Sequence, residues 1–121
     1  MKIQTTAQVT NLIIDGEQVK LDSAHDIELE FSAIDTGGAF RDPILDFSFR
    51  IPQQKWEAVS REDRHELELR LSDPDDESRT TNFSYEGALA ATEDHDIEAN
   101  GRLKEEQLSR EVIGFVLQLL R

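Results

Sequence analysis

DIELEFSAID, residues 26–35, is the stretch that decides the fold of this chain. Its apolar side chains stand at every second position, with charged or polar side chains between them. The apolar set is Ile27, Leu29, Phe31 and Ala33, and the polar set is Glu28, Glu30 and Ser32. A side-chain period of two is typical of a β-strand with one buried and one exposed face. We therefore expect a strand here, in a sheet whose second face meets water.

The same period recurs along the chain and predicts a sheet. Alternating or short apolar segments occur at 2–10, 19–21, 44–51, 65–72, 81–91 and 97–99. Asp15-Gly16 lies between two of them and is a strong hairpin signal. Polar turns separate the others, among them the acidic run DPDDESRTT at 73–81, which we expect to be a loop. The pattern predicts about five to seven strands in a largely antiparallel arrangement.

A helical period replaces the strand period in a short central segment. Pro52 suits the first turn of a helix, and Trp56 and Val59 lie three residues apart. This spacing predicts a short helix over residues 53–60.

The C-terminal segment also has helical spacing. Its apolar positions are Leu108, Val112, Phe115, Val116 and Leu119. They predict an amphipathic helix of about four turns that packs on the sheet. Gly114 weakens such a helix, so we expect it to mark a close approach to the sheet. A buried strand over residues 112–119 is the alternative.

Together these elements define the expected architecture. The chain has 121 residues, which fits a single domain over 1–121. A sheet with one apolar face must be covered, either by the C-terminal helix or by folding over itself as a partial sandwich. We therefore predict an α+β fold, a mainly antiparallel sheet with a helix near 53–60 and a C-terminal helix.

Charge limits the classes of partner. The net charge is −13, with 26 acidic against 13 basic residues. Such a balance disfavours direct binding to nucleic acids, whose phosphates need lysine and arginine, and to anionic membrane surfaces. It favours attraction to a basic protein. Adaptation to high salt is an alternative explanation for an acidic chain with few lysines.

The sequence offers little evidence for a cofactor or for export. It has no cysteine, which excludes disulfides, thiol nucleophiles and cysteine-based zinc sites. The N-terminal segment lacks the apolar core of a signal peptide, and the longest apolar run, 112–117, is too short to span a membrane. We expect a cytoplasmic protein without a cofactor.

Motifs for metal binding and catalysis are incomplete. His25, His65 and His95 stand beside acids, but none has a second histidine at metal-ligand spacing. We expect them to be solvated turn residues. DPDDES resembles the start of a calcium loop, but Ser78 stands where the EF-hand requires glycine. Glycine-rich phosphate loops and nucleophile motifs are absent from the sequence, so we expect neither an enzyme nor a metal site.

The candidate partner-binding residues are acidic and aromatic. The acids stand at outward strand positions or in turns, and would form a contiguous negative face if their strands are neighbours. They are Glu28, Glu30, Asp46, Glu66, Glu68, Asp73, Asp75, Asp76, Glu77, Glu93, Asp94 and Asp96. The aromatic candidates for an interface are Phe40, Trp56 and Tyr85. The other phenylalanines, Phe31, Phe47, Phe49, Phe83 and Phe115, fall on apolar faces and are expected in the core.

Function follows from charge complementarity. An acidic surface of this kind speeds encounter with a basic partner and selects it. We expect a non-enzymatic interaction protein, of the type of an inhibitor or immunity protein that neutralises a basic toxin such as a nuclease. The alternatives are a self-associating structural β-domain of a phage or secretion assembly, and a small enzyme or metal-binding domain.

Overall fold

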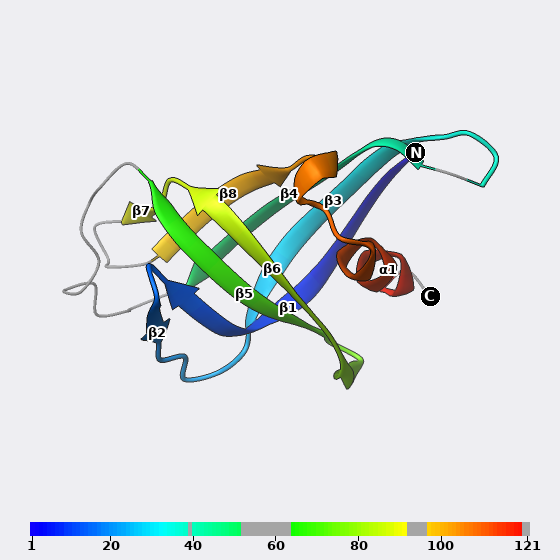
Figure 1. Cartoon of the computed structure of the whole chain (residues 1–121). Coiled ribbons are helices and arrows are strands. Elements are labelled where there is room, and N and C mark those ends of the chain that lie inside the picture. Colours follow the sequence, from blue (N-terminus) through cyan, green and yellow to red (C-terminus); the bar gives the residue numbers. More distant parts are fainter. Residues whose placement is uncertain (39, 52–63, 92–96, 120–121) are drawn as a thin grey trace.

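One antiparallel sheet and a C-terminal helix make up the fold in the computed structural model, which describes residues 1–38, 40–51, 64–91 and 97–119 (Figure 1). The strands are β1 (Lys2–Ile14), β2 (Glu17–Val19), β3 (His25–Asp35), β4 (Phe40–Ile51), β5 (His65–Asp73), β6 (Asp76–Gly87), β7 (Ala90–Ala91) and β8 (Ile97–Leu103). A 3₁₀ turn at Glu105–Gln107 precedes helix α1 (Arg110–Gln118). The predicted α+β architecture is confirmed; β2 and β7 are short strands of 3 and 2 residues.

The sheet has the strand order β6-β5-β1-β3-β4-β8-β7, with β2 paired to β1. Strand β1 joins two halves, because its residues 2–9 pair with β3 and its residues 8–14 pair with β5. Thr10 is an extra residue between Val9 and Asn11, so the register with β5 shifts there. This bulge bends the strand and reverses its alternation. It explains why Val9 and Leu12, three residues apart, are both buried.

The bent sheet folds back over itself, so its two halves share one core. Phe47 of β4 lies with its ring centroid 5.3 Å from that of Phe83 and 4.9 Å from that of Tyr85, both on β6. Strands β5 and β6 therefore cross over β3, β4 and β8 (Figure 1). The expected core phenylalanines Phe31, Phe47, Phe49, Phe83 and Phe115 are all buried.

Helix α1 packs against β6, next to which it lies in Figure 1. Ser109 caps it, since the Ser109 hydroxyl accepts a hydrogen bond of 3.2 Å from the backbone N–H of Val112. Val112, Phe115 and Val116 are its buried residues. None of the helices in the described ranges is long and apolar enough to cross a membrane.

Several local expectations were wrong. Helix α1 has 9 residues, or about two and a half turns, where about four turns were expected. DPDDESRTT is not a loop throughout, because β6 already begins at Asp76. Strand β8 does not end before Asn100-Gly101 but runs through them to Leu103. Gly114 does not mark a close approach, because a Cβ atom built on it would meet nothing within 4 Å. The helix expected over 53–60 lies outside the described residues.

Candidate interaction surface

Strands β1, β3, β4 and β8 present one outward side, which we call the polar face. Its residues are Lys2, Gln4, Thr6, Gln8, Asp26, Glu28, Glu30, Ser32, Ile44, Asp46, Ser48, Arg50, Glu98, Asn100 and Arg102, which lie in cross-strand pairs. The inward residues between them, such as Leu29 and Phe47, are buried in the core. Five carboxylates and three bases therefore share one side of four adjacent strands.

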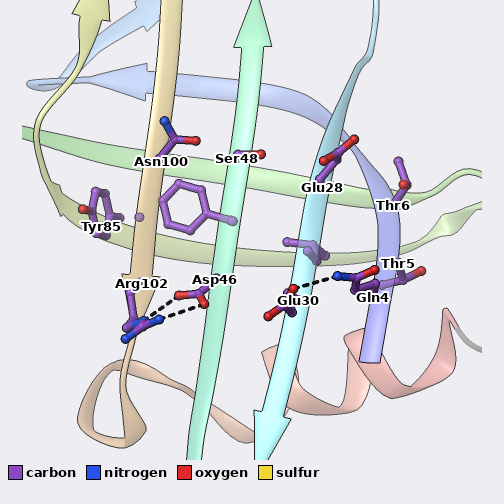
Figure 2. Close-up of a pocket in the computed structure, with 13 residues that line it drawn as sticks. Gln4, Thr5, Thr6, Glu28, Glu30, Asp46, Ser48, Tyr85, Asn100 and Arg102 are labelled. Atoms are coloured by element: carbon purple, nitrogen blue, oxygen red, sulfur yellow. Dashed lines mark hydrogen bonds and ion pairs between the residues drawn. The ribbon is translucent and has the colours of Figure 1, made fainter. Parts of the chain in front are cut away.

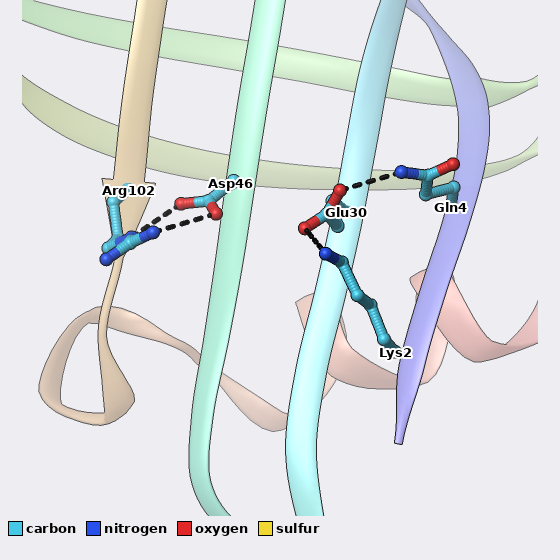
Figure 3. A network of polar contacts seen from close by, with 5 residues as sticks. All are labelled: Lys2, Gln4, Glu30, Asp46 and Arg102. Atoms are coloured by element: carbon cyan, nitrogen blue, oxygen red, sulfur yellow. Dashed lines mark hydrogen bonds and ion pairs between the residues drawn. The ribbon is translucent and has the colours of Figure 1, made fainter.

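A row of ionic contacts crosses all four strands of this face. Glu30 on β3 lies directly opposite Asp46 on β4, and like charges in that position destabilise a sheet. Arg102 relieves Asp46 through two hydrogen bonds, of 2.7 and 3.1 Å, to the two carboxylate oxygens. On the other side, Glu30 receives a hydrogen bond of 2.8 Å from the Gln4 amide and an ion pair of 3.2 Å from Lys2 (Figure 3). Each carboxylate thus has its own donor.

These contacts favour the charged forms of Glu30 and Arg102. The hydrogen bonds from Gln4 and Lys2 lower the pKa of Glu30, although the nearby Asp46 carboxylate acts in the opposite direction. The hydrogen bonds and charge of Asp46 raise the pKa of Arg102. Glu30 and Arg102 therefore stay ionised at neutral pH. A third pair, Arg50 with Glu98 at 3.4 Å, lies across β4 and β8.

The polar face contains an open depression of about 800 Å³ (Figure 2). Glu28, Ser48 and Asn100 line one side of it, Glu30, Asp46 and Arg102 line the other, and Tyr85 of β6 stands at its β8 side. Tyr85 can lie there because Gly101 has no side chain: a Cβ atom on Gly101 would come within 2.6 Å of the Tyr85 ring and 2.5 Å of the Phe47 ring. Tyr85 is therefore half-buried and anchored in the core, with only part of the ring available for contact.

The predicted acidic residues do not all lie together. Glu28, Glu30 and Asp46 share the polar face, whereas Glu66 and Glu68 lie on β5 in the other half of the sheet. Because Phe47 and Phe83 meet in the core between the halves, their polar neighbours point to opposite sides of the molecule. The acids therefore form two separate outward faces.

Four further acids lie at the hairpin between β5 and β6, where local hydrogen bonds organise the turn. Asp73 accepts a hydrogen bond of 2.9 Å from the backbone of Asp75, and Asp76 accepts bonds of 3.0 and 2.6 Å from the backbone and hydroxyl of Ser78. The bonds from Ser78 lower the pKa of Asp76. Asp73 is buried, so it is less accessible to a partner than expected, and Glu77 is exposed.

Of the remaining predicted partner-binding residues, Phe40 lies within the described residues and four others do not. Glu93, Asp94, Asp96 and Trp56 lie outside the described residues. Phe40 is 37% exposed and contacts the Phe31 ring edge-on at 5.7 Å. It is therefore partly open, at the end of the core.

His65 differs from the expectation of a solvated turn residue. It is buried, with an Asp15 carboxylate oxygen 2.6 Å from its Nδ1 atom. Asp15 also accepts a hydrogen bond of 2.9 Å from the backbone N–H of Glu66. The hydrogen bond with His65, followed by that from Glu66, lowers the pKa of Asp15. These contacts tie the β1–β2 turn to the start of β5. His25 is half-buried, and His95 lies outside the described residues.

Sequence reasoning missed Lys2, Gln4, Asn100 and Arg102, although they belong to the same face. The alternation in residues 2–10 already placed Gln4 outward, but only the pairing of β1 with β3 places it beside Glu30. The pairing of β4 with β8 does the same for Arg102 and Asp46. The missing information was the strand order.

Within the described ranges, histidine and acidic side chains form no group of three or more that could hold a metal ion.

Known proteins add no functional information to this geometry. Comparison with models of protein families, with curated proteins and with solved structures finds no match to this chain.

Proposed function

We propose that this chain is an interaction protein that binds a basic protein partner through an acidic surface. The single observation that carries the proposal is the polar face: a broad side of four strands on which carboxylates outnumber bases and which none of the described elements covers. A sheet side of this kind, in a chain with net charge −13, attracts cationic proteins over a distance.

An inhibitor or immunity protein is the form of this function that we favour. The nucleic-acid-binding cleft of a nuclease is lined with bases that contact phosphates, so an acidic domain can occupy that cleft and block it. The half-buried Tyr85 beside the depression adds an aromatic contact of the type enriched at interfaces. No step of this function requires a cofactor or a catalytic group in the chain.

A salt-dependent capture experiment tests the proposal. The purified protein is immobilised, exposed to lysate of its native host at low salt, and eluted along a salt gradient. We expect one basic protein to elute at a defined salt step. The isolated partner should then bind with an affinity that falls as salt rises and, if it is a nuclease, lose its activity at an equimolar ratio. Elution of only a diffuse set of cationic proteins contradicts the proposal.

Self-association is the second candidate, and exposed apolar residues favour it. Met1, Ile34 and Phe40 are 46%, 56% and 37% exposed, respectively. Met1 pairs with Ala33 through backbone hydrogen bonds of 2.8 and 3.0 Å, which places it at the same end of β3 as Ile34. An oligomer that forms with rising protein concentration and does not respond to salt, measured by sedimentation velocity, would favour this candidate.

A further inference from the structure

Glu28 differs from three of the other four carboxylates on the polar face. Glu30, Asp46 and Glu98 are each paired with a base of the same face. In the described part of the chain, no ion pair or side-chain hydrogen bond reaches the Glu28 carboxylate. Its carboxylate therefore has no base in direct contact within the described residues and is open to an incoming cation at the side of the depression. Arg50 lines a hollow together with Glu28, but its guanidinium pairs with Glu98.

The surroundings of Glu28 suit a lysine or arginine side chain. Its cross-strand neighbours are Thr6 and Ser48, and Asn100 lies beyond Ser48 on β8. All are small or neutral groups that can accept hydrogen bonds. Figure 2 shows this row across the depression, above the row formed by Glu30, Asp46 and Arg102. A cationic group seated here can be paired by one carboxylate and hydrogen-bonded by its neighbours.

An apolar residue lies further along the same strand and the same side. Ile34 is 56% exposed. The pairing of β3 with β4 is irregular near Ile34. On β3 one residue separates Ser32 from Ile34, whereas on β4 two residues, Asp42 and Pro43, separate the residues that pair with them. The extra residue therefore belongs to β4. The alternation of β3 is therefore uninterrupted, and Ile34 faces the same side as Glu28. Six residues of strand separate the two, or about 20 Å.

We infer that a segment of the basic partner lies along β3 on the polar face, with a lysine or arginine side chain on Glu28 and an apolar side chain on Ile34. This inference rests on the proposed function and specifies its binding site. Charge complementarity at Glu28 and the apolar contact at Ile34 are independent of each other. Together they give the partner segment a direction as well as a position.

A synthetic peptide tests the site without knowledge of the partner. The probe is an acetylated seven-residue peptide with leucine first, arginine last, and serine and threonine between. We expect it to shift the backbone NMR signals of Glu28, Ser48 and Asn100 through its arginine and those of Ile34 through its leucine. Glu28→Gln should weaken binding about two- to fivefold, the range of an exposed ion pair. Ile34→Ser should weaken it without altering the charge.

Matched controls separate this inference from simple acidity. Glu68→Gln removes the same charge from the opposite face, and we expect it to leave the affinity unchanged. The peptide with glutamate in place of arginine should not shift the signals of Glu28 and Ser48. Thermal unfolding of each variant confirms that the fold is retained.

Two outcomes would overturn the inference. One is that the peptide shifts signals of β5 and β6 and binding responds to Glu68→Gln but not to Glu28→Gln. The other is that Ile34 is buried by a second copy of the chain, seen as an oligomer that Ile34→Ser dissociates. In the first case a salt-sensitive basic partner could still be captured, so the proposed function would stand. Failure to capture one would instead refute the proposed function.

Discussion

Glu30 and Asp46 lie directly opposite each other on β3 and β4, and a different base holds each of them: Lys2 at 3.2 Å and Arg102 at 2.7 Å. The sheet tolerates this like-charge pair because both carboxylates are compensated from outer strands. Replacing Arg102 with glutamine should therefore destabilise the fold at low salt, since Asp46 then faces Glu30 without its base. Urea unfolding should show a lower midpoint, with the difference shrinking at 1 M NaCl through screening.

The double variant Asp46→Asn with Arg102→Gln is the control for that prediction. It removes both the base and the carboxylate, so we expect its urea midpoint to recover towards that of the wild type. An Arg102→Gln midpoint equal to the wild type at low salt would show that the row contributes nothing to stability.

Gly101 is the position where a single methyl group should disturb the core. A Cβ atom there would lie 2.5 Å from the Phe47 ring and 2.6 Å from the Tyr85 ring. Gly101→Ala should therefore destabilise the protein by about 1–3 kcal/mol, the usual cost of overpacking. Chemical denaturation measures it. If the clash is the cause, Phe47→Leu should cost less in the Gly101→Ala background than in the wild type; equal costs in both would refute it.

Much of the fold was predictable because alternation is a local property. The strand at 26–35 and the burial of Phe31 follow from the period of two alone. The bulge at Thr10 was not predictable in this way. The sequence shows only that the apolar positions change parity between Val9 and Leu12, and this change does not tell a bulge within one strand from the end of the strand. Tertiary pairing with β5 decides that the strand continues through it.

The candidate site was predictable only in part, because a site depends on strand order. Outward positions such as Glu28 and Glu68 could be recognised, but not that they point to opposite sides of the molecule. His65 follows the alternation of β5 and is buried, but its acidic neighbour Glu66 and its place at the start of the strand suggested a solvated turn residue. Its partner Asp15 is 50 residues away in sequence.

The contact of Asp15 with His65 predicts a pH dependence of stability. The pKa of Asp15 is lowered from its ordinary value of 3.8 by the hydrogen bonds from His65 and Glu66. Its stabilising contribution is therefore complete well above its ordinary value of 3.8 and is lost as pH falls through the lowered folded value. Asp15→Asn should destabilise the protein at pH 7 by about 1 kcal/mol or less, because Asp15 is half exposed. The difference in urea midpoint between the variant and the wild type should shrink as pH falls towards 2.

The test of this pH dependence is urea unfolding of both proteins between pH 2 and pH 7. A stability difference that is constant over this range would mean that the charge of Asp15 is not involved. A difference that grows as pH falls from 4 to 2 would contradict the lowered pKa of Asp15.

Gly114 offers a stabilising substitution. It lies inside α1, its φ angle is not in the left-handed region, and a Cβ atom there would meet nothing within 4 Å. Alanine should stabilise the helix by about 1 kcal/mol, because glycine has the larger conformational entropy in the unfolded chain. Differential scanning calorimetry should show a Tm higher by about 4 °C. A lower Tm would mean that α1 packs more closely than its open side indicates.

Thr81 presents the opposite case, a buried group with an unmet hydrogen bond. Its side chain is 5% exposed, and its hydroxyl has no hydrogen-bond partner among the described residues. Valine has the same branched shape without the hydroxyl, so Thr81→Val removes a desolvated polar group and leaves the packing intact. We expect the free energy of unfolding to rise by up to about 1 kcal/mol in urea denaturation. Thr80→Val is the matched control. Because Thr80 is exposed, this substitution should change the free energy of unfolding by less than about 0.5 kcal/mol. If Thr81→Val destabilises the protein and Thr80→Val does not, the Thr81 hydroxyl has a hydrogen-bond partner in solution, such as a buried water.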